Sequence, residues 1–345
     1  MSTIATGESL LEVRDLRVHF PTPDGVVKAV DGLSFKVDRG ETFGIVGESG
    51  SGKSVTCLTA LGLITRKSAH IEGEILYRGR DLLTMSSDEL QHIRGREIAM
   101  IFQDPFASLH PMYRVGDQLV EAVRVHEDVN KKAARERVVE LLAAVGIPRP
   151  RERFRDNPHQ YSGGMRQRAM IAMALLHNPD VLIADEPTTA LDVTVQAQIL
   201  ELIQRIKDEF QIGVILITHD LAVIADVART VVVMYAGRAM ELGTRDELFG
   251  KPLHPYTWGL LESIPRVASK GEPLLPIEGS PPSLIHVPPG CPFHPRCPHR
   301  FSPCDDKRPE FKDRGGGHRE ACHLSAEDKR KLWAEREARR TKVVA

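Results

Sequence analysis

A glycine-rich segment at residues 43–54, Phe-Gly-Ile-Val-Gly-Glu-Ser-Gly-Ser-Gly-Lys-Ser, places the strongest constraint on how this chain can fold. It matches the pattern Gly-x-x-x-x-Gly-Lys-Ser/Thr, with an apolar run typical of a buried strand before it and a helix start after it. Glycines let the backbone bend into a concave nest of N–H groups, and the helix N-terminus adds partial positive charge there. The segment therefore predicts a binding site for nucleotide phosphates rather than a coincidental turn.

Individual residues of this segment suit particular atoms of a bound nucleotide. The Lys53 ammonium is expected to reach the β- and γ-phosphates, and the Ser54 hydroxyl is expected to ligate Mg²⁺. The expected nucleotide contacts in the segment are Gly47, Ser49, Gly50, Ser51, Gly52, Lys53, Ser54 and Val55.

Charge and hydropathy argue against several classes of protein. Lys and Arg number 46 against 47 acidic residues among 345, so the balance gives no sign of a nucleic-acid or anionic-membrane partner. Residues 1–8 lack the basic start and apolar run of a signal peptide, and no stretch of about 18 uncharged apolar residues is present. We expect a soluble, cytosolic protein that does any membrane work through partner proteins.

Strand patterns surround the glycine-rich segment. Residues 10–20 alternate apolar and polar side chains, and residues 26–30 and 33–37 have the pattern of two further strands, which together predict a small antiparallel sheet beside the nucleotide. Phe20 ends the first of these strands. Spacing alone favours equally two roles for it: stacking on an adenine ring, or packing in the core.

Polar residues end two later buried strands. Residues 181–184 are apolar and lead into Asp185 and Glu186, and paired acids there are costly unless a metal or a reaction uses them. Asp185 suits Mg²⁺ coordination through water, and Glu186 suits a base that polarises an attacking water. His219 closes the strand at 214–217, a position where a lone histidine is more often a satisfied cap than a catalyst.

A second anion-seeking helix start lies farther along the chain. Residues 115–146 have helical periodicity, and Ser162-Gly163-Gly164 then directly precedes another helix. Unsatisfied N–H groups with no bulky side chain beside them favour an anion at this point. Taken alone, a serine-capped loop would be the simpler interpretation.

The order of these motifs resembles the ATP-binding subunit of ABC transporters, over about residues 8–250. The resemblance implies a head-to-tail dimer with two ATP molecules between the subunits. Residues that would serve the ATP on this subunit are Lys53, Ser54, Gln103, Asp185, Glu186 and His219, with Mg²⁺ held through Ser54, Gln103 and Asp185. Residues that would be presented to the partner's γ-phosphate are Ser162, Gly163, Gly164 and Met165, with Asp192 at the seam. Met165 departs from the family's usual Gln, which puts one polar contact in doubt.

Residues 103–111, Gln-Asp-Pro-Phe-Ala-Ser-Leu-His-Pro, narrow the resemblance to oligopeptide and dipeptide permease ATPases. In that family the segment meets the membrane subunit, so Gln103 would link the γ-phosphate and Mg²⁺ to the contact surface. Residues 161–168 and 251–257 resemble the same branch. The implied partners are a second, non-identical ATPase subunit in a heterodimer, two transmembrane permeases and an external peptide-binding protein. The implied location is the cytoplasmic face of the membrane.

Four of the five cysteines cluster within 32 residues near the C-terminus, as Cys291, Cys297, Cys304 and Cys322. Disulfides are disfavoured in a cytosolic protein, and the spacings are wider than the usual pairs of structural zinc. Four thiolates also suit an iron–sulfur cluster. The resemblance associates this tail with a [4Fe–4S] cluster, and zinc or free thiols remain as alternatives. A metal would contribute folding energy to a proline-rich tail with little core of its own. The charged segment 327–342 has the pattern of a solvated helix or frayed tail.

The fold predicted from these features is α/β: a P-loop NTPase (RecA-like) core, a small antiparallel β subdomain, a helical insert at about 104–176, and a Cys-rich extension at 251–345. The predicted activity is ATP hydrolysis that powers uptake of di- or oligopeptides. The same machinery for nickel or another small solute is an alternative, because subunits outside this chain select the cargo. A soluble ABC ATPase acting on nucleic acid or ribosomes fits less well, since such proteins generally carry two ATPase units or long coiled-coil insertions.

Overall fold

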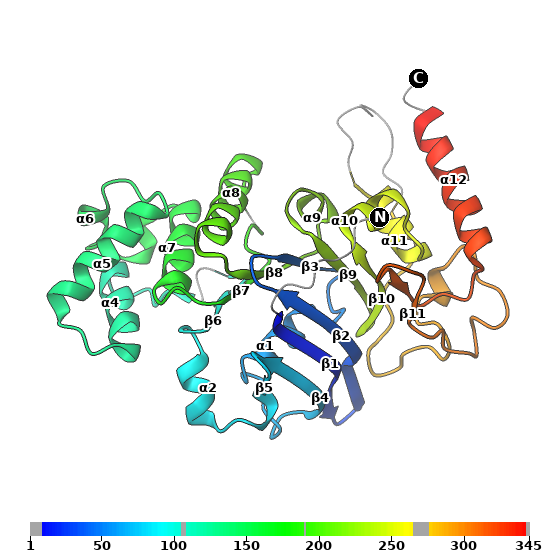
Figure 1. Ribbon diagram of the computed structural model, residues 1–345, viewed down its shortest axis with the longest axis horizontal. Coiled ribbons are helices and arrows are strands. Elements are labelled where there is room, and N and C mark those ends of the chain that lie inside the picture. Colours follow the sequence, from blue (N-terminus) through cyan, green and yellow to red (C-terminus); the bar gives the residue numbers. More distant parts are fainter. Residues whose placement is uncertain (1–8, 105–107, 190, 265–275, 343–345) are drawn as a thin grey trace.

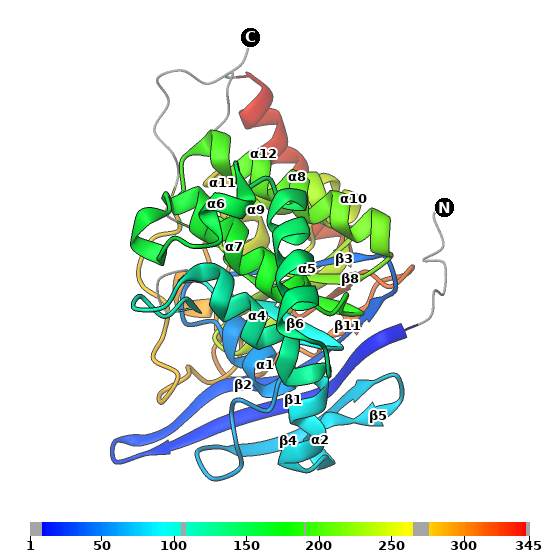
Figure 2. The same cartoon turned by 90° about the vertical axis from the view of Figure 1, so that its left-hand side faces the viewer.

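The computed structural model describes residues 9–104, 108–189, 191–264 and 276–342, and it contains two β-sheets. The smaller sheet is antiparallel and has the strand order β2-β1-β4-β5. Its strands are β1 (Ser9–Thr22), β2 (Gly25–Asp38), β4 (His70–Tyr77) and β5 (Arg80–Asp81). In Figures 1 and 2 it lies below the rest of the molecule.

The predicted antiparallel sheet is present, but the two strands expected at 26–30 and 33–37 are one strand. The pairing of β2 with β1 passes from Leu33 opposite Leu16 to Asp31 opposite Arg17, so Gly32 has no partner. Gly32 has a φ of 92°, which glycine adopts readily and which suits a β-bulge. The bulge interrupts the alternation of side chains without ending the strand.

The larger sheet has the order β11-β12-β10-β9-β3-β8-β7-β6. Its five strands β9, β3, β8, β7 and β6 run parallel to one another. Its strands are β3 (Thr42–Val46), β6 (Ile98–Ile101), β7 (Val181–Asp185), β8 (Gly213–Thr218), β9 (Thr230–Tyr235), β10 (Arg238–Thr244), β11 (Lys312–Asp313) and β12 (Arg319–Glu320). Two short C-terminal strands, β12 and β11, extend the sheet beyond β10.

Helices cover the larger sheet, and α1 (Lys53–Ala60) lies between it and the smaller one. The others are α2 (Ser87–Ile93), α4 (Val115–His126), α5 (Lys131–Ala144), α6 (Pro150–Arg153), α7 (Gly163–Leu175), α8 (Val193–Phe210), α9 (Leu221–Val227), α10 (Arg245–Gly250), α11 (Pro255–Glu262) and α12 (Ala326–Lys342). Helices α4, α5, α6 and α7 gather at one end of the molecule, and α11 and α12 lie at the other (Figure 1).

Two hydrophobic clusters form the core, one on each face of the larger sheet. Strand β8 shows the division, because Val214 and Leu216 enter one cluster while Ile215 and Ile217 enter the other. The first cluster contains side chains of helices α4, α5, α7, α8 and α9 and of the C-terminal region. The second joins the smaller sheet and α1, which is how the helix behind the glycine-rich segment becomes fixed between the two sheets.

The C-terminal region packs more tightly than the sequence suggested. Phe293 and Trp333 are buried in the first cluster, although a tail with little core was expected. Residues 326–342 form a helix, but the prediction that it is solvated holds for only part of its surface. The Lys329 side chain is 1% exposed and lies 2.6 Å from Glu320, and Trp333 donates a hydrogen bond to the Gly250 carbonyl. None of the described helices is both long and apolar enough to cross a membrane.

Candidate functional site

The carboxyl ends of four parallel strands bring the predicted site residues to one edge of the larger sheet. Val46, the last residue of β3, pairs with Thr218 at the end of β8, and Asp185 at the end of β7 pairs with Ile217. The glycine-rich loop, His219 and Glu186 therefore leave the sheet side by side. Such an edge is where ligands bind in open α/β sheets.

The glycine-rich loop needs glycine at two of its positions for steric reasons. Gly47 has a φ of 154°, and a Cβ there would lie 2.1 Å from the Met234 carbonyl oxygen. Gly52 has a φ of 99°, and a Cβ there would lie 2.1 Å from the Ala29 carbonyl oxygen. The loop is thus pressed against β9 and β2, and any side chain at these positions would push it away.

Lys53 lies inside this loop and is held by neutral oxygen atoms. Its Nζ donates to the Gly47 and Glu48 carbonyls at 2.7 and 2.9 Å, and it lies 3.4 Å from the Ser51 hydroxyl. Burial lowers the pKa of the ammonium, although Glu186, Asp185 and Glu48 act to raise it. Within the described residues the hydrogen-bond acceptors of Lys53 are all neutral, and a buried ammonium so placed favours an anion as its further ligand.

Glu186 is fixed by three side chains from three different segments. Gln103 Nε2 donates to Glu186 Oε2 at 2.8 Å, Thr189 Oγ1 donates to the same oxygen at 2.9 Å, and His219 Nδ1 lies 3.2 Å from Oε1. Glu186 has a φ of 46°, an uncommon conformation for a side chain larger than glycine, and its N–H donates to the Ile217 carbonyl. Strained residues of this kind persist at functional sites.

The two adjacent carboxyl groups have opposite pKa shifts. Burial raises the pKa of Asp185, although a hydrogen bond from Ser54 opposes the shift. Burial also acts to raise the pKa of Glu186, but the hydrogen bonds from Thr189 and His219 outweigh it, so the pKa of Glu186 is lowered. Glu186 is therefore ionised at neutral pH, as a group that accepts a proton or orients a water must be.

Asp185 has the environment of a cation ligand. The side chain is buried, and its Oδ1 atom has no hydrogen-bond partner within the described parts of the chain. An unpaired buried carboxylate oxygen is costly, and a bound Mg²⁺ would remove that cost. The residues predicted to hold Mg²⁺ thus offer oxygen donors of the kind this ion prefers.

The Ser-Gly-Gly segment begins helix α7, as predicted. The exposed Ser162 caps the helix by accepting a hydrogen bond from the Met165 N–H at 3.3 Å. A Cβ on Gly164 would lie 3.0 Å from Val195, so the start of α7 lies against the start of α8. Asp192 caps α8 and accepts a hydrogen bond from the Val195 N–H at 2.9 Å. The two helix starts form one exposed surface.

Several predicted nucleotide contacts lie outside the group of residues that surrounds Glu186, and one contact of Glu186 was not predicted. Phe20 is half-buried and packs against the second core cluster, as does Val55. Thr189, which contacts Glu186, was not predicted, because no motif distinguishes it from an ordinary turn threonine. Ser49 and Gly50 are exposed at the tip of the loop.

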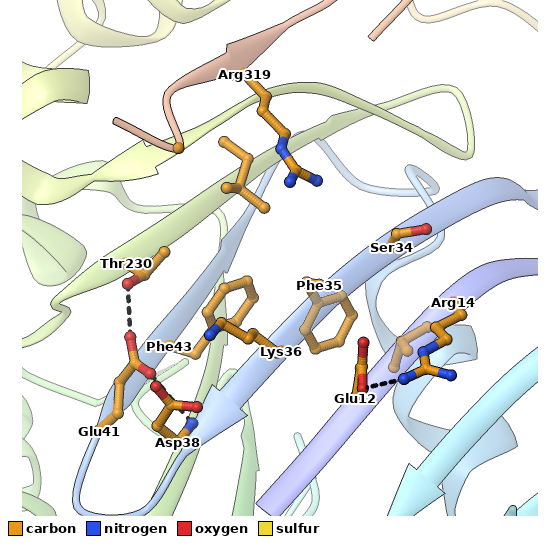
Figure 3. A pocket seen from close by; sticks show the side chains of 13 residues that line it. Glu12, Arg14, Ser34, Phe35, Lys36, Asp38, Glu41, Phe43, Thr230 and Arg319 are labelled. Carbon is orange, nitrogen blue, oxygen red and sulfur yellow. Dashed lines mark hydrogen bonds and ion pairs between the residues drawn. The ribbon is translucent and has the colours of Figure 1, made fainter. Parts of the chain in front are cut away.

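A separate pocket of about 230 Å³ lies between the two sheets and the C-terminal strands (Figure 3). The stacked rings of Phe35 and Phe43, 4.7 Å apart, lie in it. Two pairs of its polar groups contact each other, since Glu41 accepts from Thr230 at 2.5 Å and Arg14 donates to Glu12 at 2.7 Å. None of the residues predicted to contact the nucleotide lines it.

The four clustered cysteines line one cavity. Cys291, Cys297, Cys304 and Cys322 surround it together with His254, Pro255, Phe293, His294, His299, His323 and Leu324. All four thiols are free, and burial raises the pKa of Cys291 and of Cys322 to about 12. Among the described residues, no three His, Cys, Asp or Glu side chains are arranged to hold a metal ion. The structure therefore brings the cysteines together but does not show ligand geometry.

Comparison with known proteins decides the family. The model of the ABC transporter family matches residues 30–189, and the model of the oligopeptide/dipeptide transporter C-terminal region matches residues 240–304. The dipeptide transport ATP-binding protein DppD of Bacillus subtilis is 54% identical over 318 residues, which are 92% of this chain and 95% of that protein. The oligopeptide transport ATP-binding protein OppD of Escherichia coli is 50% identical over 321 residues, 93% of this chain and 95% of that protein.

The chain belongs to the ATP-binding subunits of oligopeptide and dipeptide ABC transporters. Solved structures confirm the ATPase fold of this family. A dimeric bacterial ABC transporter cassette aligns with a TM-score of 0.61 at 26% identity, covering 68% of this chain and 98% of the other. A dimeric cassette in a post-hydrolysis state, bound to ADP and phosphate, aligns with a TM-score of 0.62.

Thr189→Val tests how the Glu186 carboxylate is tuned. Because the Thr189 hydroxyl helps to lower the pKa of Glu186, its removal should raise that pKa. The basic form of Glu186 would then be lost at a higher pH as the solution is acidified. We expect the acidic limb of the pH profile of kcat for ATP hydrolysis to move to higher pH, with ATP affinity unchanged. An unmoved acidic limb would remove Thr189 from this role.

Proposed function

We propose that this chain binds and hydrolyses ATP to power the uptake of di- or oligopeptides through partner permease subunits. The observation that carries the proposal is the position of Glu186, ionised and held between Gln103, Thr189 and His219 at the strand edge that also carries buried Lys53. The similarity to dipeptide and oligopeptide transport ATPases over more than nine-tenths of the chain supports peptide as the cargo.

Each site residue has a defined part in the proposed reaction. The N–H groups of the glycine-rich loop and Lys53 bind the phosphates, and electrostatic stabilisation of this kind supplies most of the catalysis of phosphoryl transfer. Glu186 orients and polarises the attacking water, while His219 and Gln103 keep its carboxylate in place. Ser54, Gln103 and Asp185 would hold Mg²⁺, whose charge neutralises developing negative charge on the phosphate oxygens.

The proposed catalytic unit is a dimer, in which each chain supplies half of each ATP site. In support, Ser162 and Asp192 are exposed at the starts of α7 and α8, with the half-buried Gly163 beside Ser162, and the N-terminus of a helix of this length suits a phosphate. Helix α7 lies among α4 and α5, away from α1, which follows the chain's own phosphate loop (Figure 1). The proposed partner is a second, related ATPase subunit.

The proposed contact with the permeases lies near Gln103. Met112 and Tyr113 follow the Gln103 segment and are 76% and 62% exposed, which is unusual for large apolar side chains. Through an apolar contact surface next to the Gln103 segment, a structural change caused by ATP binding would be transmitted to a permease subunit. An external peptide-binding protein would deliver the cargo, and the chain would lie on the cytoplasmic face of the membrane.

Glu186→Gln tests the proposed reaction and its link to transport. The amide keeps the size of the side chain but cannot act as a base, so ATP should remain bound while turnover falls by about 10²-fold or more. Cells carrying the variant should stop peptide uptake, and the permeases should still copurify. Copurification of nucleic acid in place of permeases, or unchanged turnover, would contradict the proposal.

We further propose that the cysteine-lined cavity holds a [4Fe–4S] cluster, with zinc as the alternative metal centre. Four free thiols around one cavity are a suitable donor set, and thiolates are the usual ligands of iron–sulfur clusters. The raised thiol pKa values mean that binding must release protons, so a metal would be held more weakly at low pH. The bound group would stabilise the fold of the C-terminal region.

Iron and sulfide analysis of the purified chain tests this proposal. We expect brown protein with about four irons per chain, and we expect Cys304→Ser to lose most of the iron and to lower the melting temperature. Cys57→Ala is the matched control, because Cys57 is buried on α1 and should leave the iron content unchanged. Zinc alone in the metal analysis would reject the cluster.

A further inference from the structure

The C-terminal region contacts the phosphate loop directly, at Glu48. Arg296 Nη1 lies 2.7 Å from Glu48 Oε2, and the side chain of Arg296 is 7% exposed. The Glu48 backbone N–H donates to the Tyr256 hydroxyl at 3.0 Å. Two residues from the C-terminal region therefore hold one phosphate-loop residue, through its side chain and through its backbone.

The Arg296 guanidinium is fixed by more than this ion pair. Its Nε donates to the Glu278 carbonyl at 2.9 Å, and its Nη2 donates to the Ile277 carbonyl at 3.1 Å. Its Nη1 also reaches the Tyr235 hydroxyl at 3.3 Å. A planar guanidinium that uses its donors in several directions is rigid, and lysine could not reproduce the arrangement.

Glu48 in turn positions the groups that would bind phosphate. Its carbonyl oxygen accepts hydrogen bonds from Lys53 Nζ at 2.9 Å and from the Ser51 N–H at 3.2 Å. A shift of Glu48 would therefore move the acceptor of Lys53 and one N–H group of the loop. Displacements of about 1 Å at such positions have large effects on binding and catalysis.

Arg296 also belongs to the loop that carries the clustered cysteines. It ends the short 3₁₀ helix His294–Arg296 and immediately precedes Cys297, which lines the cavity. Phe293 packs against Tyr235 and Tyr256, with ring centroids 5.4 and 5.2 Å away. The cysteine-bearing loop (residues 291–297) is thus joined to the phosphate loop through Arg296 and through the aromatic cluster around Phe293.

We propose that Arg296 is a positioning residue that couples the cysteine-lined cavity to the phosphate loop. When Arg296 holds Glu48, the loop is ordered for nucleotide phosphates, and a bound nucleotide in turn orders the cysteine-bearing loop. The two effects must be equal in free energy, because coupling between two sites is reciprocal. The inference rests on the proposed nucleotide site and adds to it a control element outside the ATPase motifs.

A double-mutant cycle in the full chain tests the coupling. The equilibrium dissociation constant for Mg·ADP is measured for the wild type, Arg296→Ala, Glu48→Ala and the double variant. The rate of backbone amide hydrogen exchange of residues 291–297 is measured in each, with and without Mg·ADP, because this rate can be read whether or not the cysteines hold a metal centre. Arg314→Ala is the matched control, because Arg314 forms a comparable ion pair in the same region, 2.6 Å from Glu320.

We expect each single variant to bind Mg·ADP about tenfold more weakly and the double variant to be no worse, since both remove one interaction. Mg·ADP should slow hydrogen exchange of residues 291–297 in the wild type and in Arg314→Ala, but not in the other variants. Three results would overturn the coupling: an ADP affinity unchanged in Arg296→Ala, effects of the two substitutions that multiply in the double variant, or protection of residues 291–297 by Mg·ADP that survives in the Arg296→Ala or Glu48→Ala variant. If Arg296→Ala does not fold, Glu48→Ala decides by the same two readouts, because it leaves the bonds of Arg296 to Ile277 and Glu278 in place.

The wild type and Lys53→Ala separate this inference from the proposed function. Wild-type protein that binds no Mg·ADP, or Lys53→Ala that binds it equally well, would contradict the phosphate site itself. If Mg·ADP binding depends on Lys53 but Arg296→Ala matches the wild type in both readouts, the phosphate site stands and only the coupling is contradicted.

Discussion

The burial of the Lys53 ammonium is the constraint on which the rest of the site depends. It is surrounded by carbonyl and hydroxyl oxygens in a loop whose glycines press against two neighbouring strands. The cost of burying this charge is offset only in part, because burial still lowers the pKa of the group. The loop is therefore preorganised for a strongly anionic ligand, which the phosphates of ATP supply.

The sheet topology turns this single site into a catalytic one. Parallel strands carry their carboxyl ends to one edge, so residues separated by tens of positions meet there. Glu186 shows the effect, since Gln103 reaches it from 83 residues away and His219 from 33. The strained backbone of Glu186 fixes its carboxylate between these partners. In the proposed dimer, the exposed helix starts at Ser162 and Asp192 complete the ATP site of the partner chain.

Features that depend on local sequence were predicted well. The glycine-rich turn between β3 and α1, the buried strands and the helix start after Ser162 each follow from the identity and spacing of a few neighbouring residues. The division of β2 was predicted wrongly because the bulge at Gly32 breaks the local alternation of side chains. The role of Thr189 was missed because it depends on how a turn folds back onto Glu186.

Features that depend on distant contacts were not predicted from the sequence. The strands β11 and β12 are only two residues long, and they form because β10 offers an edge to pair with. The ion pair of Arg296 with Glu48 joins residues 248 positions apart, and neither residue is marked by a local pattern. The burial of Trp333 likewise depends on α12 docking on the rest of the chain. These contacts join the C-terminal region to the rest of the fold.

The most direct measurement of the central claim compares ATP turnover of the chain held as a monomer with its turnover when paired with a second ATPase subunit. Sedimentation in the presence of nucleotide would establish the state of each sample. The account predicts that the monomer binds ATP through the phosphate loop but hydrolyses it at a small fraction of the paired rate, because Ser162 and Gly163 act on the partner's nucleotide. Equal turnover per chain in the two states would contradict it.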